Sequence, residues 1–90
     1  MSIHIGGWEF DHASYDAEAD VLYLSMGGPR PGYGEETPEG HVLRFDENDQ
    51  FYGVTLITPR YLLERGELVV SLPQNKTVSP DEIERVLQPA

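Results

Sequence analysis

The chain has 90 residues, a formal net charge of −10 at pH 7 and no cysteine. Its length allows one hydrophobic core, so we expect a single domain over residues 1–90, and the lack of thiols excludes disulfides, thiolate nucleophiles and thiolate zinc sites. The negative charge disfavours direct contact with nucleic acid or a membrane surface. Because no signal-peptide pattern and no apolar run of about 20 residues is present, we expect a cytoplasmic protein.

Short apolar runs predict β-structure in the first half of the chain. Residues 8–15 begin with aromatic and acidic side chains in alternation, as in a half-buried strand. Residues 16–20 are expected to form a turn, and residues 21–26 are the clearest strand because they are rich in β-branched, aliphatic and aromatic side chains. Glycine and proline recur over residues 26–40, so we predict a loop there.

A hairpin and a short helix are predicted next. Residues 42–45 and 51–57 have strand character and are separated by turn residues, and Gly53 in the second run indicates a bulge or a close backbone approach. Thr58 is the expected N-cap of a short helix that starts with Pro59 and stops before Gly66. Residues 67–72 return to a strand pattern, and residues 73–78 are read as a polar connection.

The chain is expected to end in an amphipathic helix. Ser79 and Glu82 have the capping-box spacing, and Ile83, Val86 and Leu87 then fall on one helical face. The fold class predicted from these elements is α+β. In this fold a four- to five-stranded, mostly antiparallel sheet has a short helix after the central hairpin and the C-terminal helix packed on one face.

No pattern typical of catalysis or cofactor binding is present, and we expect no cofactor. His4, His12 and His41 are isolated, and each is interpreted as a surface or strand residue. The acidic turns that start at Asp16 and Asp46 share the first ligand positions of calcium loops but lack the glycine at position six and the glutamate at position twelve. A small hydrolase or metal-dependent enzyme that uses His12 or His41 is therefore less favoured than the two functions described next, an interaction module and a homo-oligomer.

The negative charge is concentrated in one part of the chain. Residues 9–49 carry eleven acidic residues against Arg30 and Arg44, a net charge of −9, whereas the remaining residues have a net charge of −1. Such a field attracts a basic protein, and the expected partner-binding residues are Glu35, Glu36 and Glu39. The leading hypothesis is a non-enzymatic protein-interaction module, and the alternative is a homo-oligomer, such as a homodimer, with a structural or housekeeping role.

Residues 15–25, which read Tyr-Asp-Ala-Glu-Ala-Asp-Val-Leu-Tyr-Leu-Ser, resemble the DUF2283 family of short bacterial and archaeal proteins. The hallmark of that family is a Tyr-Asp-x-Glu-Ala-Asp-x-Leu-Tyr run. The resemblance continues through Glu36, residues 39–46 and residues 53–57, so that it covers about half of the chain.

The resemblance implies a compact, mostly antiparallel sheet with a helix, and it brings no catalytic residues with it. Some relatives look like the smaller members of gene pairs whose neighbour resembles a ribonuclease-type toxin, which implies an antitoxin-like binder of a basic protein. The motif also has a structural interpretation, in which the carboxylates of Asp16 and Asp20 accept backbone N–H groups at a turn while Leu22 and Leu24 enter the core.

Overall fold

The computed structural model describes residues 2–28 and 30–87. In chain order the elements are β1 (Ile3–Ile5), β2 (Trp8–Phe10), β3 (His12–Asp16), β4 (Val21–Ser25), β5 (Gly32–Glu36), β6 (Val42–Asp46), β7 (Phe51–Ile57), α1 (Pro59–Glu64), β8 (Ser71–Leu72), β9 (Lys76–Thr77) and α2 (Pro80–Leu87). None of the helices in these residues has both the length and the apolar character needed to cross a membrane.

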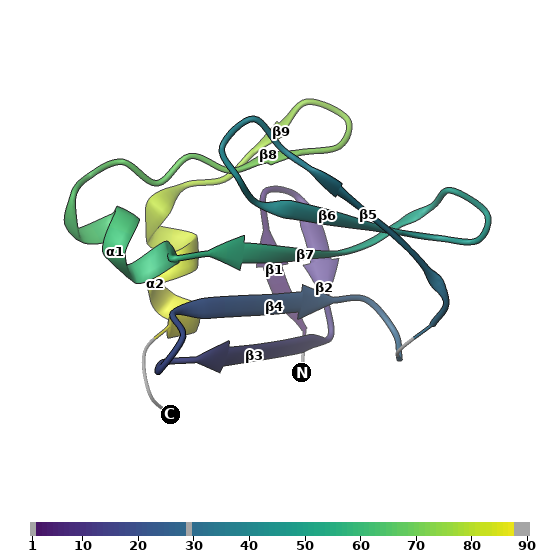
Figure 1. The fold of residues 1–90 in the computed structure, drawn as a ribbon, viewed down its shortest axis with the longest axis horizontal. Coiled ribbons are helices and arrows are strands. Elements are labelled where there is room, and N and C mark those ends of the chain that lie inside the picture. Colours follow the sequence, from purple (N-terminus) through teal and green to yellow (C-terminus); the bar gives the residue numbers. More distant parts are fainter. Residues whose placement is uncertain (1, 29, 88–90) are drawn as a thin grey trace.

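A five-stranded sheet in the order β3-β4-β7-β6-β5 forms the centre of the molecule (Figure 1). All four strand pairings are antiparallel, which confirms the predicted sheet. The expected irregularity at Gly53 is also present, because the β6–β7 register shifts between Arg44 and Phe45. A Cβ atom at Gly53 would lie 2.7 Å from the carbonyl oxygen of Leu24, so the close approach of β4 requires glycine there.

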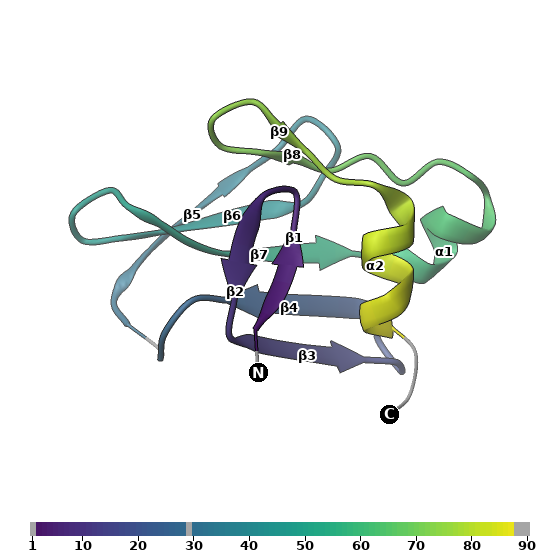
Figure 2. The same cartoon turned by 180° about the vertical axis from the view of Figure 1, so that it is seen from behind.

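One face of this sheet is covered and carries the core. The β1–β2 hairpin and α2 lie on the same face, behind the sheet in Figure 1 and in front of it in Figure 2. The buried side chains that fill the space between them come from the sheet, the hairpin, the segment after α1, and α2. They are Ile5, Phe10, Leu22, Leu24, Val54, Leu56, Leu68, Val70, Leu72, Ile83 and Leu87. The architecture is therefore α+β, with the C-terminal helix packed on one face of the sheet as predicted.

The predicted loop over residues 26–40 is wrong in part, because β5 lies within it and pairs with β6 from Gly32 to Glu36. The glycines that suggested a loop allow this pairing. A Cβ atom at Gly32 would lie 2.1 Å from the carbonyl oxygen of Phe45, and one at Gly34 would lie 2.8 Å from a methyl carbon of Val42. Glycine therefore permits close strand contact at this edge instead of preventing it.

Two predicted strands also differ from the observed ones. The run over residues 8–15 breaks at Asp11, so that β2 pairs with β1 while β3 pairs with β4. The Asp11 carboxylate accepts the Gly27 N–H at 2.9 Å and fixes the chain at this break. The strand predicted over residues 67–72 is shorter in the structure, because only β8 at its end is paired. Its partner, β9, lies within residues 73–78, which were predicted to be a connection without a strand.

The helix α2 begins where the capping-box spacing predicts, but only one of the two hydrogen bonds of a capping box is formed. The Glu82 carboxylate accepts the Ser79 N–H at 2.8 Å, which is one half of a capping box. The same carboxylate accepts the Gly6 N–H at 3.3 Å, so that it also ties the β1–β2 turn to the helix. One side chain therefore caps α2 and joins it to the hairpin beside it.

Candidate interaction site

The strand β5 forms one edge of the sheet, and all five of its residues are exposed. Within the described residues β5 pairs only with β6, so its outer backbone groups are available to another chain. Glu35 is opposite Leu43 and Glu36 is opposite Val42 in the register of the two strands. Because neighbouring residues of a strand point to opposite faces, the two carboxylates lie on either side of this open edge.

The third predicted partner-binding residue, Glu39, has a different environment. It lies in the turn between β5 and β6, and its carboxylate accepts the backbone N–H of Ser71 at 3.2 Å and the hydroxyl of Ser71 at 3.3 Å. Glu39 therefore holds the start of β8 against the sheet. Of the three predicted residues, the structure places Glu35 and Glu36 together on the edge and gives Glu39 a contact within the fold.

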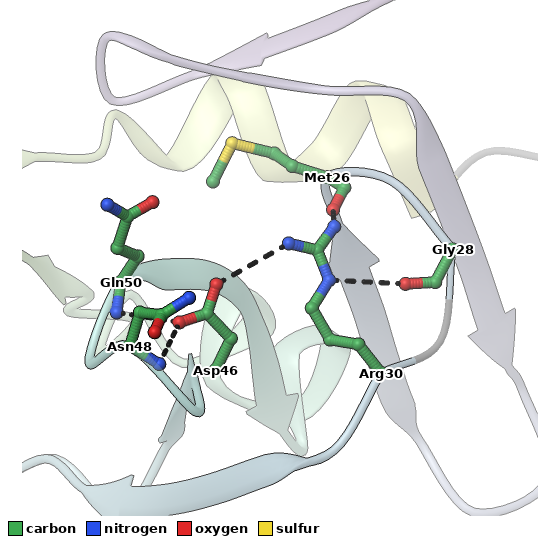
Figure 3. A network of polar contacts seen from close by, with 6 residues as sticks. All are labelled: Met26, Gly28, Arg30, Asp46, Asn48 and Gln50. Carbon is green, nitrogen blue, oxygen red and sulfur yellow. Dashed lines mark hydrogen bonds and ion pairs between the residues drawn. The ribbon is translucent and has the colours of Figure 1, made fainter.

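The turn between β6 and β7 adds further acidic groups at the other end of β5, next to Gly32. Here the Asp46 carboxylate accepts the backbone N–H groups of Asn48 at 2.8 Å and Gln50 at 3.0 Å (Figure 3). The bond from Gln50 N–H is the largest cause that holds the pKa of Asp46 below its usual value, and Arg30 acts in the same direction. The calcium-loop resemblance of this turn is thus explained by hydrogen bonds to its own backbone.

Arg30 connects this turn to the segment before β5. Its guanidinium donates to the carbonyl oxygens of Met26 and Gly28, and it lies 3.7 Å from the Asp46 carboxylate (Figure 3). The same group stacks over the ring of Tyr52, 4.9 Å from its centroid. These contacts fix the path along which the chain enters the edge strand.

Asp49 is oriented by the edge strand itself. It occupies the left-handed region with φ of 61°, and its carboxylate accepts the Tyr33 hydroxyl at 2.8 Å. This hydrogen bond raises the pKa of Tyr33 above its ordinary value. We call the group formed by Glu35, Glu36, Asp46, Glu47 and Asp49 the acidic edge. It combines negative charge with a strand edge that has no partner among the described residues, which suits recognition of a basic peptide segment.

The Tyr15–Asp20 part of the motif has a structural role that links distant parts of the chain. Asp16 accepts the N–H groups of Glu18 and Ala19, as expected for the turn. Asp20 instead reaches α1, where its two carboxylate oxygens accept the N–H groups of Arg60 and Tyr61, each at 3.1 Å. The Tyr15 hydroxyl donates to the same carboxylate at 2.8 Å.

Asp20 therefore supplies the side-chain acceptor that the sequence suggested for Thr58. Thr58 occupies the N-cap position as predicted, but it has φ of 49° and its side chain makes no capping hydrogen bond. Burial disfavours the charged form of Asp20, but the bonds from Tyr15, Tyr61 and Arg60 outweigh this effect and lower the pKa of its carboxyl. A carboxylate at a helix start is also favoured by the helix dipole.

We expect Asp20→Asn to lower the free energy of unfolding by about 1–2 kcal/mol, because it removes a charged acceptor at a helix start while asparagine tolerates the same backbone conformation. Since the folded pKa of Asp20 is lowered, its contribution is present above about pH 4 and is lost as the pH falls through the folded pKa. Urea melts at pH 7 and pH 3 measure both effects. Glu18→Gln in the same turn is the control, and an equal loss in both variants would contradict this role.

The histidines are separated in the structure. His41 is buried, with 1% of its surface exposed, and its ring bonds to the Ile57 N–H and the Val69 carbonyl, both at 3.1 Å. The interpretation of His41 as a surface or strand residue is therefore wrong. His12 is exposed on β3, 3.6 Å from Asp11. In residues 2–28 and 30–87, no group of three histidine, aspartate or glutamate side chains is arranged to hold a metal ion.

These features define a small acidic α+β protein whose antiparallel sheet is covered on one face and has an exposed acidic edge strand. A family model described as a protein of unknown function, DUF2283, matches residues 12–58, which is 47 of the 90 residues. The chain therefore belongs to the DUF2283 family. Comparisons with curated proteins and with solved structures find no match.

Proposed function

We propose that this protein is a non-enzymatic interaction module that binds a basic protein through its acidic edge. The observation that carries the proposal is the open side of β5, which presents Glu35 and Glu36 on a strand with unpaired backbone groups. A partner segment can add to this edge by main-chain hydrogen bonds, while its basic side chains meet the carboxylates.

The charge around β5 supports a basic partner. The acidic edge holds five carboxylates, and only that of Asp46 has a cation at 4 Å or less among the described residues. Opposite charges accelerate encounter by a factor of about 10 to 1,000 at low ionic strength, and like charges exclude the wrong partners. The family resemblance makes a ribonuclease-type toxin one candidate for this partner.

The test is a double charge reversal, Glu35→Lys with Glu36→Lys. We expect a basic protein captured by the wild type from its own host lysate to associate with this variant at least about ten-fold more slowly in 50 mM salt. Both residues are exposed, so the variant should remain folded. Stopped-flow association with the purified partner across a salt series is the measurement, and the wild-type rate should fall as salt rises.

The control makes the same change in charge elsewhere. Glu18→Lys with Glu84→Lys also replaces two negative charges with two positive ones, at exposed positions outside the acidic edge. If this control slows association as much as the β5 variant, the effect comes from net charge, and the assignment to the edge is wrong. Glu39 is left unchanged because its carboxylate bonds to Ser71.

The uncovered face of the sheet favours a second candidate function, a homodimer. Tyr23 and Ile57 lie on this face with 48% and 38% of their surfaces exposed, and Gly53 lies within a hollow of about 360 Å³ beside Tyr23. Burial of such a face in a two-fold interface is driven by apolar contact. A dimer whose sedimentation is unchanged across the salt series, and which captures no basic protein, would replace the first proposal with this one.

A further inference from the structure

Beside the acidic edge lies a groove lined by aromatic rings, which we call the aromatic groove. It has a volume of about 370 Å³ and lies between β2, the β6–β7 hairpin and the turn after β8. Its apolar lining consists of Trp8, Phe45, Phe51 and Pro73, and its polar lining consists of Asp49, Gln50 and Gln74. None of these residues is basic.

The rings are held at fixed angles to one another. Phe51 contacts Trp8 with centroids 4.9 Å apart and planes at 60°, and it contacts Phe45 at 6.1 Å and 63°. Tyr33 of β5 stacks on Phe45 at 5.5 Å, so the edge strand lies directly beside one ring of the groove. The Trp8 indole N–H donates to the Pro73 carbonyl at 3.4 Å, which fixes this ring against the turn after β8.

A carboxylate completes the groove. Asp49 belongs both to the acidic edge and to the lining of the groove, and the Tyr33 hydroxyl orients it. Aromatic faces attract organic cations through their quadrupole, and the planar guanidinium of arginine both stacks on such faces and bonds to carboxylates. Inclined rings with one carboxylate and no basic residue therefore suit a guanidinium better than a neutral or anionic group.

We propose that the aromatic groove binds an arginine side chain of a basic protein partner. This inference rests on the proposed function, because the groove adjoins β5 and would take a side chain of a segment that runs along that strand. The partner's main chain and its lysine or arginine side chains meet the acidic edge, while one arginine enters the groove as an anchor.

The probe is N-acetyl-argininamide, with N-acetyl-citrullinamide as its uncharged counterpart of the same shape. Trp8 is the only tryptophan in the chain, so its fluorescence and its indole N–H resonance report on this groove alone. We expect the arginine compound to shift both signals saturably and to bind roughly ten-fold more tightly than the citrulline compound. Equal shifts with the two compounds would overturn the proposal.

Two variants locate the site. Phe45→Leu keeps an apolar side chain but removes a ring, and Asp49→Asn removes the charge at a position where asparagine tolerates the positive φ. Each should weaken arginine binding about five-fold or more, while Glu18→Gln, at an exposed position outside the acidic edge and the groove, should leave it unchanged. A urea melt of each variant establishes that it is folded. Unchanged arginine binding in both folded variants would contradict the assignment of the binding site to the aromatic groove.

The two proposals can fail separately. If Phe45→Leu leaves partner association unchanged while the Glu35 and Glu36 reversal slows it, the edge binds the partner and the groove does not. If Trp8 responds to arginine as expected but no basic partner depends on β5, the groove binds a guanidinium and the proposed function is wrong.

Discussion

Replacing Ile83 with alanine is expected to lower the free energy of unfolding by about 3 kcal/mol. The Ile83 side chain is fully buried in the core between α2 and the sheet. Removal of three methyl or methylene groups from such a site loses their transfer free energy and leaves a cavity. Because α2 has only eight residues, packing and not intrinsic propensity holds it, so the loss should appear in full in urea melts.

Ser79→Ala is the matched control on the same helix. The Ser79 hydroxyl makes no hydrogen bond in the described structure, and the cap is supplied by the Glu82 carboxylate. We therefore expect Ser79→Ala to change stability by less than about 0.5 kcal/mol. No loss for Ile83→Ala would contradict the packing of α2 in the core, and a loss for Ser79→Ala as large as that for Ile83→Ala would show that the serine hydroxyl supports the helix start.

His41→Ala is expected to cost about 3 kcal/mol at pH 7.5. His41 joins β7 to the segment after α1, because one ring nitrogen accepts the Ile57 N–H and the other donates to the Val69 carbonyl. Removal of the ring leaves two backbone polar groups without their partner and opens a cavity, and both effects destabilise a folded protein. Chemical denaturation measures the loss, and His12→Ala, at an exposed position on β3, is the control.

The cost of this substitution should depend on pH in a defined direction. Burial of His41 is the main cause that lowers its pKa in the folded protein, although Val69 and Glu39 act in the opposite direction. The unfolded state therefore binds a proton more readily, so the contribution of His41 is full above about pH 6.5 and decreases as the pH falls below that value towards the folded pKa. The difference between wild type and His41→Ala should shrink from pH 7.5 to 5. A constant difference would contradict a neutral buried ring.

Several features follow from local sequence chemistry alone. Side-chain alternation predicts the strand at residues 21–26, turn residues predict the hairpin over residues 42–57, and helix-start spacing predicts the final helix. Each of these elements lies where it was predicted, with shifts of about one residue. The family resemblance over residues 15–57 agrees closely with the matched segment, residues 12–58. These signals lie within a few residues of one another, so no knowledge of distant contacts is needed to read them.

Other features depend on contacts between residues far apart in the chain. The sequence around Gly32 and Gly34 is typical of a loop, and only the contact with β6 shows that these residues belong to a strand. Asp20 is typical of a turn, and its role at the start of α1 follows only from its contact with Arg60, 40 positions later. The grouping of Trp8 with Phe45, Phe51 and Asp49 likewise appears only when β2 crosses the sheet next to the β6–β7 turn.

The amino-acid sequence by itself thus determined the fold class, the charge and the position of most elements of this protein. The tertiary structure alone decided that Glu35 and Glu36 lie on an open edge, that Glu39 and His41 serve the fold, and that an aromatic groove adjoins the acidic edge. The physical reason is that side-chain periodicity and helix capping depend on residues that lie close together in the sequence. Edge exposure, burial and ring packing arise only from how the strands and helices assemble.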